Sequence, residues 1–421
     1  MLRSPLTMRG KGRAGIGSAV ALALALAGGV AAAPVMAQAQ EQPNYTPSRG
    51  FNRVYQPVAA IANAETGDFA AARAQLAGVQ AAVENADDRF LAGNVTYVLG
   101  LKLNDQPLQQ QGMELMLASG KATAAAAAEM NYFLGEWAYE AQNWARARQY
   151  LQAARSAGYT DGNADGLIAE SYFREGQVAQ GLSYLDGLIG QLVAAGQPAP
   201  EAWLRRGQAV AVQAGDAAEA ANWSARLAAA YPTAENWRRA MTVVEQMQTP
   251  DPGAYLDLLR LMTLTNALND RERFARYLDA IDPRIMATEA GRVLAAARTA
   301  GALSESDPDY ARIKAIVDER APGEPADAAN YAAEAASAAN ARPAVNAADL
   351  YLALEDFAKA EEMFQLALTK SGVDRDAVLT RLGMAQVRQG KYAEAKASFA
   401  QVSGTRAAVA RLWSAYVDST A

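Results

Sequence analysis

The stretch GKYAEAKASF, from Gly390 to Phe399, has a spacing that occurs at four other places in the chain. The aromatic Tyr392 is followed three positions later by the small Ala395 and seven positions later by the bulky Phe399. Offsets of three and seven place these side chains on one face of an α-helix. The stretch therefore predicts a helix that packs through one face of alternating large and small residues.

The five copies of this spacing begin at Phe69, Trp144, Val178, Phe357 and Tyr392. Three positions after each start lies a small residue: Ala72, Ala147, Gly181, Ala360 or Ala395. Seven positions after each start lies a large residue: Leu76, Leu151, Leu185, Phe364 or Phe399. In four copies another small residue lies nine positions before the start: Gly135, Ala169, Ala348 and Gly383. We interpret this upstream residue as the close-approach point of an earlier helix, so that the repeated unit is helix–turn–helix.

The copies recur at a nearly constant interval. Trp144 and Val178 are 34 positions apart, and Phe357 and Tyr392 are 35 apart. Leu108 and Ala217 fill intervening places with weaker matches. A supersecondary unit repeated at this interval predicts a stack of helix pairs, in which each pair buries its apolar face against the next.

Helix pairs with a period of about 34 residues resemble the tetratricopeptide repeat (TPR). The element WLRRG, residues 203–207, is similar to that family's Trp-x-x-Leu-Gly, with Arg206 in the place of Leu. Tyr172 occupies the family's tyrosine place in the first helix, and Ala138 and Gln386 depart from it. The resemblance implies an all-α, right-handed superhelical solenoid of TPR-like repeats that binds a protein or peptide. An ordinary alanine-rich helical bundle is the alternative.

The repeats divide the chain into segments. The resemblance covers two blocks, and the segment between them keeps helical periodicity while prolines interrupt it. The last repeat of a solenoid exposes its core face unless a further helix covers it. We therefore expect a signal peptide (1–39), a flexible tail (40–52), N-terminal TPR-like repeats (53–232), degenerate helical repeats (233–345), a C-terminal TPR pair (346–404) and a capping helix (405–421).

The N-terminal segment has the pattern of an export signal. Its basic residues are Arg3, Arg9, Lys11 and Arg13. An uncharged, apolar stretch follows, with small residues at Ala37 and Ala39 that suit cleavage. The alternative is an uncleaved anchor, but the apolar part is shorter than the roughly 20 residues that cross a bilayer. We expect a bacterial protein of the general secretory route that is periplasmic or secreted.

Composition excludes several classes of function. The chain has no cysteine and no histidine, which removes disulfides, thiolate nucleophiles, Ser-His-Asp triads and the usual zinc sites. Its net charge is −6, and loss of the four basic residues of the signal peptide makes it more acidic. An acidic chain is poorly suited to binding phosphate backbones. We predict no catalysis, no cofactor, no nucleic-acid partner and no membrane insertion of the mature chain.

The candidate partner-binding face lies on the first helix of the clearest repeat, EMNYFLGEWAYEA, residues 129–141. Leu134 and Gly135 face the partner helix in the repeat, so the opposite face carries Glu129, Tyr132, Glu136, Tyr139 and Glu140. The next repeat adds Glu170 and Phe173. Exposed tyrosines among carboxylates suit a polypeptide or a glycan. The alternative is that the glutamates only solvate the helix and the tyrosines pack on the neighbouring repeat.

A second stretch, DGNADGLIAESY at residues 161–172, resembles the start of a calcium-binding loop. Asp161, Asn163 and Asp165 have the ligand spacing, but Tyr172 stands where such a loop places its bidentate glutamate. We therefore interpret the stretch as a turn between repeats in which Asp165 or a neighbour caps the next helix, and predict no metal.

Taken together, the patterns predict an exported TPR-like scaffold that mediates protein–protein interaction in a bacterial cell envelope. The alternative is a glycan- or polymer-handling accessory protein that uses the acidic, aromatic groove. A carboxylate-based hydrolase within residues 233–345 is a third hypothesis. The sequence leaves the identity of the partner open.

Overall fold

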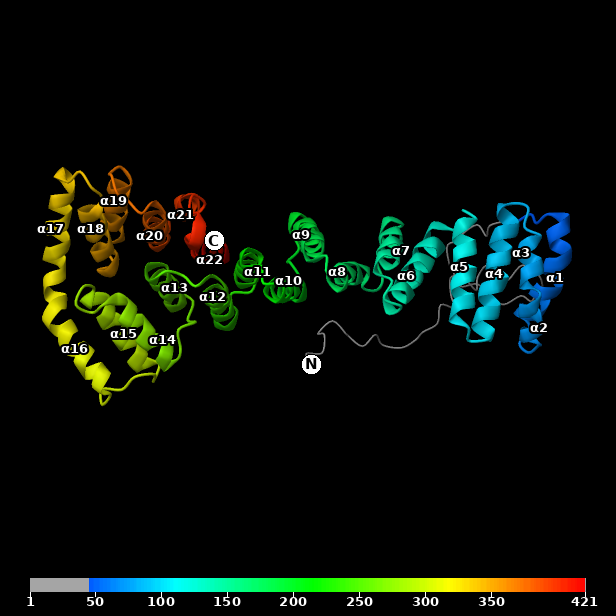
Figure 1. Cartoon of the computed structure of the whole chain (residues 1–421), viewed down its shortest axis with the longest axis horizontal. Coiled ribbons are helices and arrows are strands. Elements are labelled where there is room, and N and C mark those ends of the chain that lie inside the picture. Colours follow the sequence, from blue (N-terminus) through cyan, green and yellow to red (C-terminus); the bar gives the residue numbers. More distant parts are fainter. Residues whose placement is uncertain (1–44, 421) are drawn as a thin grey trace, which may run out of the picture. The chain divides into compact units, whose positions relative to one another are not determined.

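Helices account for almost all of the regular structure in the computed structural model, which describes residues 45–420 (Figure 1). Within these residues the only β-type contact is an isolated bridge between Asn340 and Ser371. The predicted all-α class is therefore confirmed, and the handedness of the superhelix stays a prediction. The expected signal peptide, residues 1–39, lies outside the described residues. No helix among the described residues is long and apolar enough to cross a membrane.

The chain divides into two compact units, Met1–Tyr184 and Leu185–Ala421. The helices of the first unit are α1 (Arg49–Asn63), α2 (Phe69–Ala74), α3 (Leu76–Ala81), α4 (Ala86–Lys102), α5 (Gln106–Ala118), α6 (Ala124–Glu140), α7 (Trp144–Ser156), α8 (Ala164–Arg174) and the start of α9 (Val178–Ala194). Consecutive helices pack against one another along this unit, in the pairs α4–α5, α6–α7 and α7–α8.

The first described residues are packed rather than free, which differs from the flexible tail expected at 40–52. The ring of Tyr45 stacks on Phe90 with centroids 4.5 Å apart. The Ser48 side chain caps α1, and its hydroxyl donates to Asp88 at 2.8 Å. Phe51 is fully buried. An aromatic ring and a helix cap thus hold this segment to α4 from Tyr45 onward.

Small residues bring the paired helices of the first unit close together. A methyl group on Gly135 of α6 would lie 2.6 Å from Cγ of Leu151 in α7, and one on Gly112 of α5 would lie 2.5 Å from the backbone nitrogen of Tyr97 in α4. Real Cβ atoms do not approach other atoms so closely, so only glycine fits there. The close approach predicted at Gly135 is confirmed, and the structure shows that Leu151 is the side chain that meets it.

The second unit continues the pattern of paired helices. Its helices are the end of α9, α10 (Glu201–Gln213), α11 (Ala217–Ala230), α12 (Ala234–Gln248), α13 (Pro252–Leu264), α14 (Arg271–Ile281), α15 (Ala287–Thr299), α16 (Pro308–Arg320), α17 (Glu324–Ser337), α18 (Arg342–Ala353), α19 (Phe357–Leu368), α20 (Arg375–Arg388), α21 (Tyr392–Phe399) and α22 (Ala407–Thr420).

The same close approach recurs in this unit. A methyl group on Gly383 of α20 would lie 2.4 Å from the ring of Phe399 in α21, as the spacing predicted. A methyl group on Gly207 of α10 would lie 2.2 Å from the ring of Trp223 in α11. In both of these pairs a large side chain of the second helix packs onto a glycine of the first. This is the helix–turn–helix unit that the sequence repeats indicated.

The last helix of the second unit returns to its beginning. Figure 1 shows α22 beside α11 and α12, and it packs on α11, α12 and α13 as well as on α20 and α21. The indole of Trp413 is buried and donates to the backbone oxygen of Asp257 at 3.0 Å, while Arg411 donates to the backbone oxygen of Ala218 at 3.2 Å. The helix expected to cap the last repeat therefore also joins that repeat to α11, α12 and α13.

Buried charges fix this return. Asp257 of α13 is fully buried and accepts from Arg260 at 3.1 Å, Arg381 at 3.3 Å and Arg406 at 3.0 Å. Arg381 also donates to Asp349 of α18 at 2.8 Å. Buried ions are tolerated when each is paired and hydrogen-bonded, and removal of one partner is strongly destabilising. The network therefore specifies which helices meet within the second unit.

Candidate binding site

The predicted face on α6 is less exposed than the sequence pattern indicated. Tyr132 is only 6% exposed, its ring stacks on Tyr159 with centroids 4.6 Å apart, and its hydroxyl donates to Glu136 at 2.8 Å. The backbone nitrogen of Asn163 in turn donates to the Tyr132 hydroxyl at 3.3 Å. The expectation of an exposed Tyr132 was wrong because the turn before α8 covers this part of α6.

The two residues expected from the next repeat are also engaged in packing. Glu170 of α8 is 8% exposed, and its carboxylate lies 4.0 Å from Nε of Arg174. The ring of Phe173 packs directly on Gly181 of α9: a methyl group on this glycine would lie 2.3 Å from the ring. Phe173 therefore fills the contact between α8 and α9. Phe173 and Glu170 thus lie within the helix packing rather than on an open face.

Three of the predicted residues, Glu129, Glu136 and Glu140, lie with Tyr159 and Asp161, which the helix pattern did not predict, in a patch that we call the acidic face. Tyr139 packs edge-on against the ring of Trp144. Within the acidic face, Glu140 and Asp161 are exposed, and the other three residues are partly buried. Among the described residues, none of these four carboxylates forms an ion pair with a basic side chain. Burial raises the pKa of Glu129 and of Glu136. Burial, together with the neighbouring carboxylates, also raises the pKa of Tyr159.

The stretch that resembles a calcium loop serves as a turn with a helix cap. Asn163 is the N-cap of α8, and its side-chain oxygen accepts from the backbone nitrogen of Gly166 at 3.2 Å. Asp165 pairs with Arg155 at 2.5 Å and accepts from the hydroxyl of Tyr184 at 2.8 Å. The interpretation as a capped turn agrees with these contacts.

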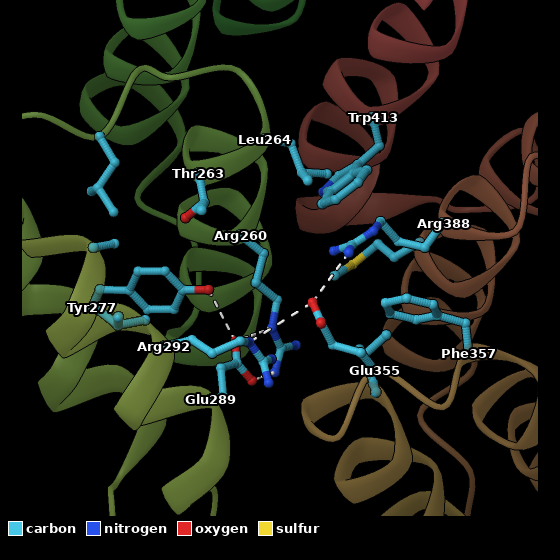
Figure 2. Close-up of a pocket in the computed structure, with 15 residues that line it drawn as sticks. Arg260, Thr263, Leu264, Tyr277, Glu289, Arg292, Glu355, Phe357, Arg388 and Trp413 are labelled. Carbon is cyan, nitrogen blue, oxygen red and sulfur yellow. Dashed lines mark hydrogen bonds and ion pairs between the residues drawn. The ribbon is translucent and has the colours of Figure 1, made fainter. Parts of the chain in front are cut away.

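The second unit contains a cavity of about 250 Å³ that the sequence patterns did not reveal (Figure 2). It lies among α13, α14, α15, α20, α22 and the turn between α18 and α19. The lining residues are Arg260, Thr263, Leu264, Leu268, Tyr277, Glu289, Arg292, Val293, Ala296, Leu352, Glu355, Phe357, Met384, Arg388 and Trp413. They come from helices far apart in the chain, which the return of α22 brings together.

One side of the cavity is a closed set of ionic contacts. Arg260 donates through two nitrogens to the two carboxylate oxygens of Glu289, each at 2.8 Å, and Tyr277 donates its hydroxyl to Glu289 at 2.9 Å. Although burial opposes ionisation, Arg260 and these hydrogen bonds hold the pKa of Glu289 below its usual range. Arg260 also pairs with Asp257. On this side the arginine is therefore already matched by carboxylates of the protein itself.

The other side is open to solvent and unevenly charged. The Glu355 carboxylate lies 3.1 Å from a nitrogen of Arg388 and 3.8 Å from Nε of Arg292 (Figure 2). The guanidinium of Arg388 also lies over the ring of Phe357, 4.4 Å from its centroid. Two guanidinium groups thus share one carboxylate at this side. The side chains of Arg292, Arg388 and Glu355 are each between 35% and 42% exposed.

The cavity also has an apolar wall. Trp413, which is fully buried, and Leu264 line it beside Arg388 and Phe357 (Figure 2). A cavity with mostly apolar walls and a few converging polar groups is the usual form of a ligand site. The arrangement can hold an apolar group beside a negatively charged one.

No known protein family model matches the sequence, and no curated protein matches it. Similar solved structures include a tetratricopeptide repeat protein from Parabacteroides merdae, with 13% identity, a TM-score of 0.25 and coverage of 65% of this chain and 91% of that one. They also include the complex of the TPR2AB domain of yeast Sti1 with pHSP90, with 16% identity, a TM-score of 0.18 and coverage of 65% and 88%. A third is the TPR domain of P58(IPK), with 11% identity, a TM-score of 0.20 and coverage of 83% and 91%.

The packing of the chain's own helix pairs identifies its fold. In three pairs a glycine of the first helix receives a large side chain of the second: Gly135 with Leu151, Gly207 with Trp223, and Gly383 with Phe399. The described part of the chain is an all-α array of helix pairs with a tetratricopeptide-like fold.

Proposed function

We propose that this chain is an exported scaffold that binds a protein partner in a bacterial cell envelope and has no catalysis of its own. The observation that carries the proposal is the acidic face of the first unit. Glu129, Glu136 and Asp161 lie around Tyr159, and Glu140 lies near Glu136. None of these carboxylates has a basic partner among the described residues. The export pattern of residues 1–39 supports the envelope as its location.

The acidic face is suited to a basic segment of a partner. Partial burial of Glu129 and Glu136 disfavours their ionised forms, which is why their pKa values are raised. A lysine or arginine side chain brought against them would stabilise the ionised carboxylates, and the part of Tyr159 that stays exposed lies next to that charge. Complementary charges of this kind also speed association and select among partners.

The alternative of a glycan ligand has less support at this face. Glycan binding of the kind expected from the sequence needs open aromatic faces. Here the rings of Tyr132 and Tyr159 stack on one another, and Tyr139 packs edge-on against Trp144 with centroids 5.1 Å apart. The tyrosines therefore use much of their surface on neighbouring rings, which favours a protein partner held through the carboxylates.

The test uses the mature chain from Gln40 onward, immobilised and exposed to envelope extract of its own organism. A face variant replaces Glu129, Glu136 and Glu140 by glutamine. A control variant removes the same charge from exposed glutamates of the second unit, with Glu235→Gln, Glu272→Gln and Glu305→Gln. Captured proteins are identified by mass spectrometry, purified, and measured for affinity at rising salt concentration.

We expect a partner that binds the native chain and the control variant, is lost from the face variant, and binds less tightly as salt rises. A partner retained equally by the face variant would overturn the assignment of the acidic face. Capture of no protein, together with binding of a purified envelope glycan, would overturn the scaffold in favour of the glycan-handling alternative.

A further inference from the structure

We propose that the cavity of the second unit binds a small organic acid, whose carboxylate takes the place of Glu355 between Arg292 and Arg388. This site is separate from the acidic face of the first unit, and the proposal does not depend on the scaffold function. Its ligand is a compact molecule with an aliphatic or aromatic body and one carboxylate.

The open side of the cavity has two guanidinium groups and one carboxylate. Arg292 and Arg388 form ion pairs only with Glu355 among the described residues. Arg260 is instead held by Glu289 and Asp257 on the closed side. The carboxylate of a ligand would therefore meet two arginines that share a single ion-pair partner.

Glu355 holds the two arginines loosely. Its contact with Arg292 is 3.8 Å long, beyond the roughly 2.7–2.9 Å of a charge-assisted hydrogen bond, and its contact with Arg388 is a single hydrogen bond of 3.1 Å. A free carboxylate can accept two parallel hydrogen bonds from a guanidinium group. A ligand can therefore make better contacts here than the side chain now in place.

The position of Glu355 lets its side chain be displaced by a ligand. Glu355 lies in the short turn between α18 and α19. Its side chain is 42% exposed, so it can swing into solvent without leaving a buried charge behind. Glu355 thus acts as an internal stand-in for the carboxylate of the ligand.

The rest of the cavity sets the size and body of the ligand. Its volume of about 250 Å³ is just below the range of about 300–1,000 Å³ that is usual for small-molecule sites. Phe357, Leu264 and Trp413 supply apolar surface next to the arginines (Figure 2). A helix or an extended peptide is too large for this volume, and an inorganic anion would leave the apolar wall uncovered.

A bound acid would also strengthen the second unit. Arg292 comes from α15 and Arg388 from α20, so one carboxylate between them bridges the middle of the unit and its end. A ligand that binds only the folded state raises the temperature of unfolding, by more as its concentration exceeds its dissociation constant. Thermal stability therefore reports binding.

The test measures thermal unfolding and calorimetric binding of the full mature chain. The probes are 3-phenylpropionate, octanoate and cyclohexanecarboxylate. 3-Phenylpropionamide, which has the apolar body without the charge, and acetate and inorganic phosphate, which have the charge without the body, are controls. Binding of at least one of the three acids with a raised unfolding temperature is expected, and the controls should give no shift.

Variants separate the proposed site from other binding. Arg292→Gln with Arg388→Gln should abolish the shift, while Arg239→Gln, at an exposed ion pair with Glu235, should leave it unchanged. Glu355→Gln should tighten binding about two- to fivefold, because it removes a competing exposed ion pair. A merely structural role for Glu355 would not produce this gain.

Three outcomes would overturn the proposal. The first is that none of the three acids binds. The second is that binding persists in the double arginine variant. The third is that a short acidic peptide binds and depends on Arg292 and Arg388 while the small acids do not, which would assign the cavity to a side chain of a protein partner. The acidic-face variants do not touch this cavity, so failure here is distinguishable from failure of the scaffold proposal.

Discussion

Asp257 and Arg406 lie 149 positions apart in the chain, and their side chains meet in the interior of the second unit at 3.0 Å. Asp257 is fully buried and accepts from Arg260 and Arg381 as well. One carboxylate of α13 therefore binds guanidinium groups from its own helix, from α20 and from the turn just before α22. The return of the chain onto α13 depends on this residue.

Replacement of Asp257 by asparagine should destabilise the second unit by about 3–5 kcal/mol, because it removes the fully buried carboxylate that three guanidinium groups share. The measurement is denaturant unfolding of the mature chain, followed by the fluorescence of the buried tryptophans. Glu305→Gln, at an exposed ion pair, serves as the control and should change stability by less than about 1 kcal/mol. Equal effects of the two substitutions would contradict the role given to Asp257.

The close approach at Gly383 gives a second prediction. A methyl group there would lie 2.4 Å from the ring of Phe399, so Gly383→Ala should destabilise the α20–α21 pair by about 1–3 kcal/mol. Gly187 lies in α9, and a methyl group on it would meet no atom within 4 Å. Gly187→Ala should therefore stabilise the chain by up to about 1 kcal/mol.

A compensating change tests the mechanism at Gly383. Phe399→Leu reduces the side chain that the new methyl group would strike, so the double variant should lose less stability than the sum of the two single changes. Strict additivity of the two losses, measured by the same unfolding experiment, would show that Gly383 and Phe399 do not act on one another.

Burial of Glu136 makes the stability of the folded chain depend on pH. Its pKa is raised in the folded chain, so the folded state binds the proton more readily than the unfolded state, and stability falls as the pH rises through the raised pKa. Glu136→Gln removes the charge and keeps an acceptor for the Tyr132 hydroxyl. The variant should be more stable than the native chain at pH 7–8.

This gain should disappear near and below the ordinary glutamate pKa of about 4.3, where the native side chain is protonated in both states. Unfolding temperature measured as a function of pH checks it, with Glu235→Gln as the exposed control. A variant that is less stable than the native chain at pH 8 would show that the ionised carboxylate is stabilising at this position.

The export prediction has a direct measurement. Expression of the full chain in a Gram-negative bacterium, followed by fractionation and mass spectrometry, should give a periplasmic protein that begins just after Ala37 or Ala39. A chain found only in the cytoplasmic fraction with Met1 intact would refute both the signal peptide and the envelope location.

The sequence was sufficient to predict the helix pairs and the small residues at which they approach. Offsets of three and seven, with a small residue nine positions upstream, predict a close approach at Gly135 and Gly383, and the structure adds Leu151 and Phe399 as the side chains that meet them. These contacts are local, because both residues of each pair lie within one helix–turn–helix unit. Their spacing in the chain is therefore enough to determine that they meet.

The surroundings of Tyr132 and of the cavity could not be predicted in this way. Helical periodicity placed Tyr132 opposite Leu134, but the turn that covers it belongs to the next repeat. Arg292, Glu355 and Arg388 come from three separate stretches, and they meet only because successive pairs curve until α22 reaches α11. That curvature is the sum of small rotations between pairs, which no local pattern records.

The return of α22 to α11 also fixes how the second unit can evolve. An open stack can gain or lose a helix pair by duplication or deletion, because each pair contacts only its neighbours. In the second unit, an extra pair inserted between α15 and α18 would carry Arg381 and Arg406 away from Asp257 and leave Trp413 without its acceptor. The second unit therefore cannot gain a repeat by gene duplication without losing these contacts. It can diversify only by substitution within a fixed number of helix pairs.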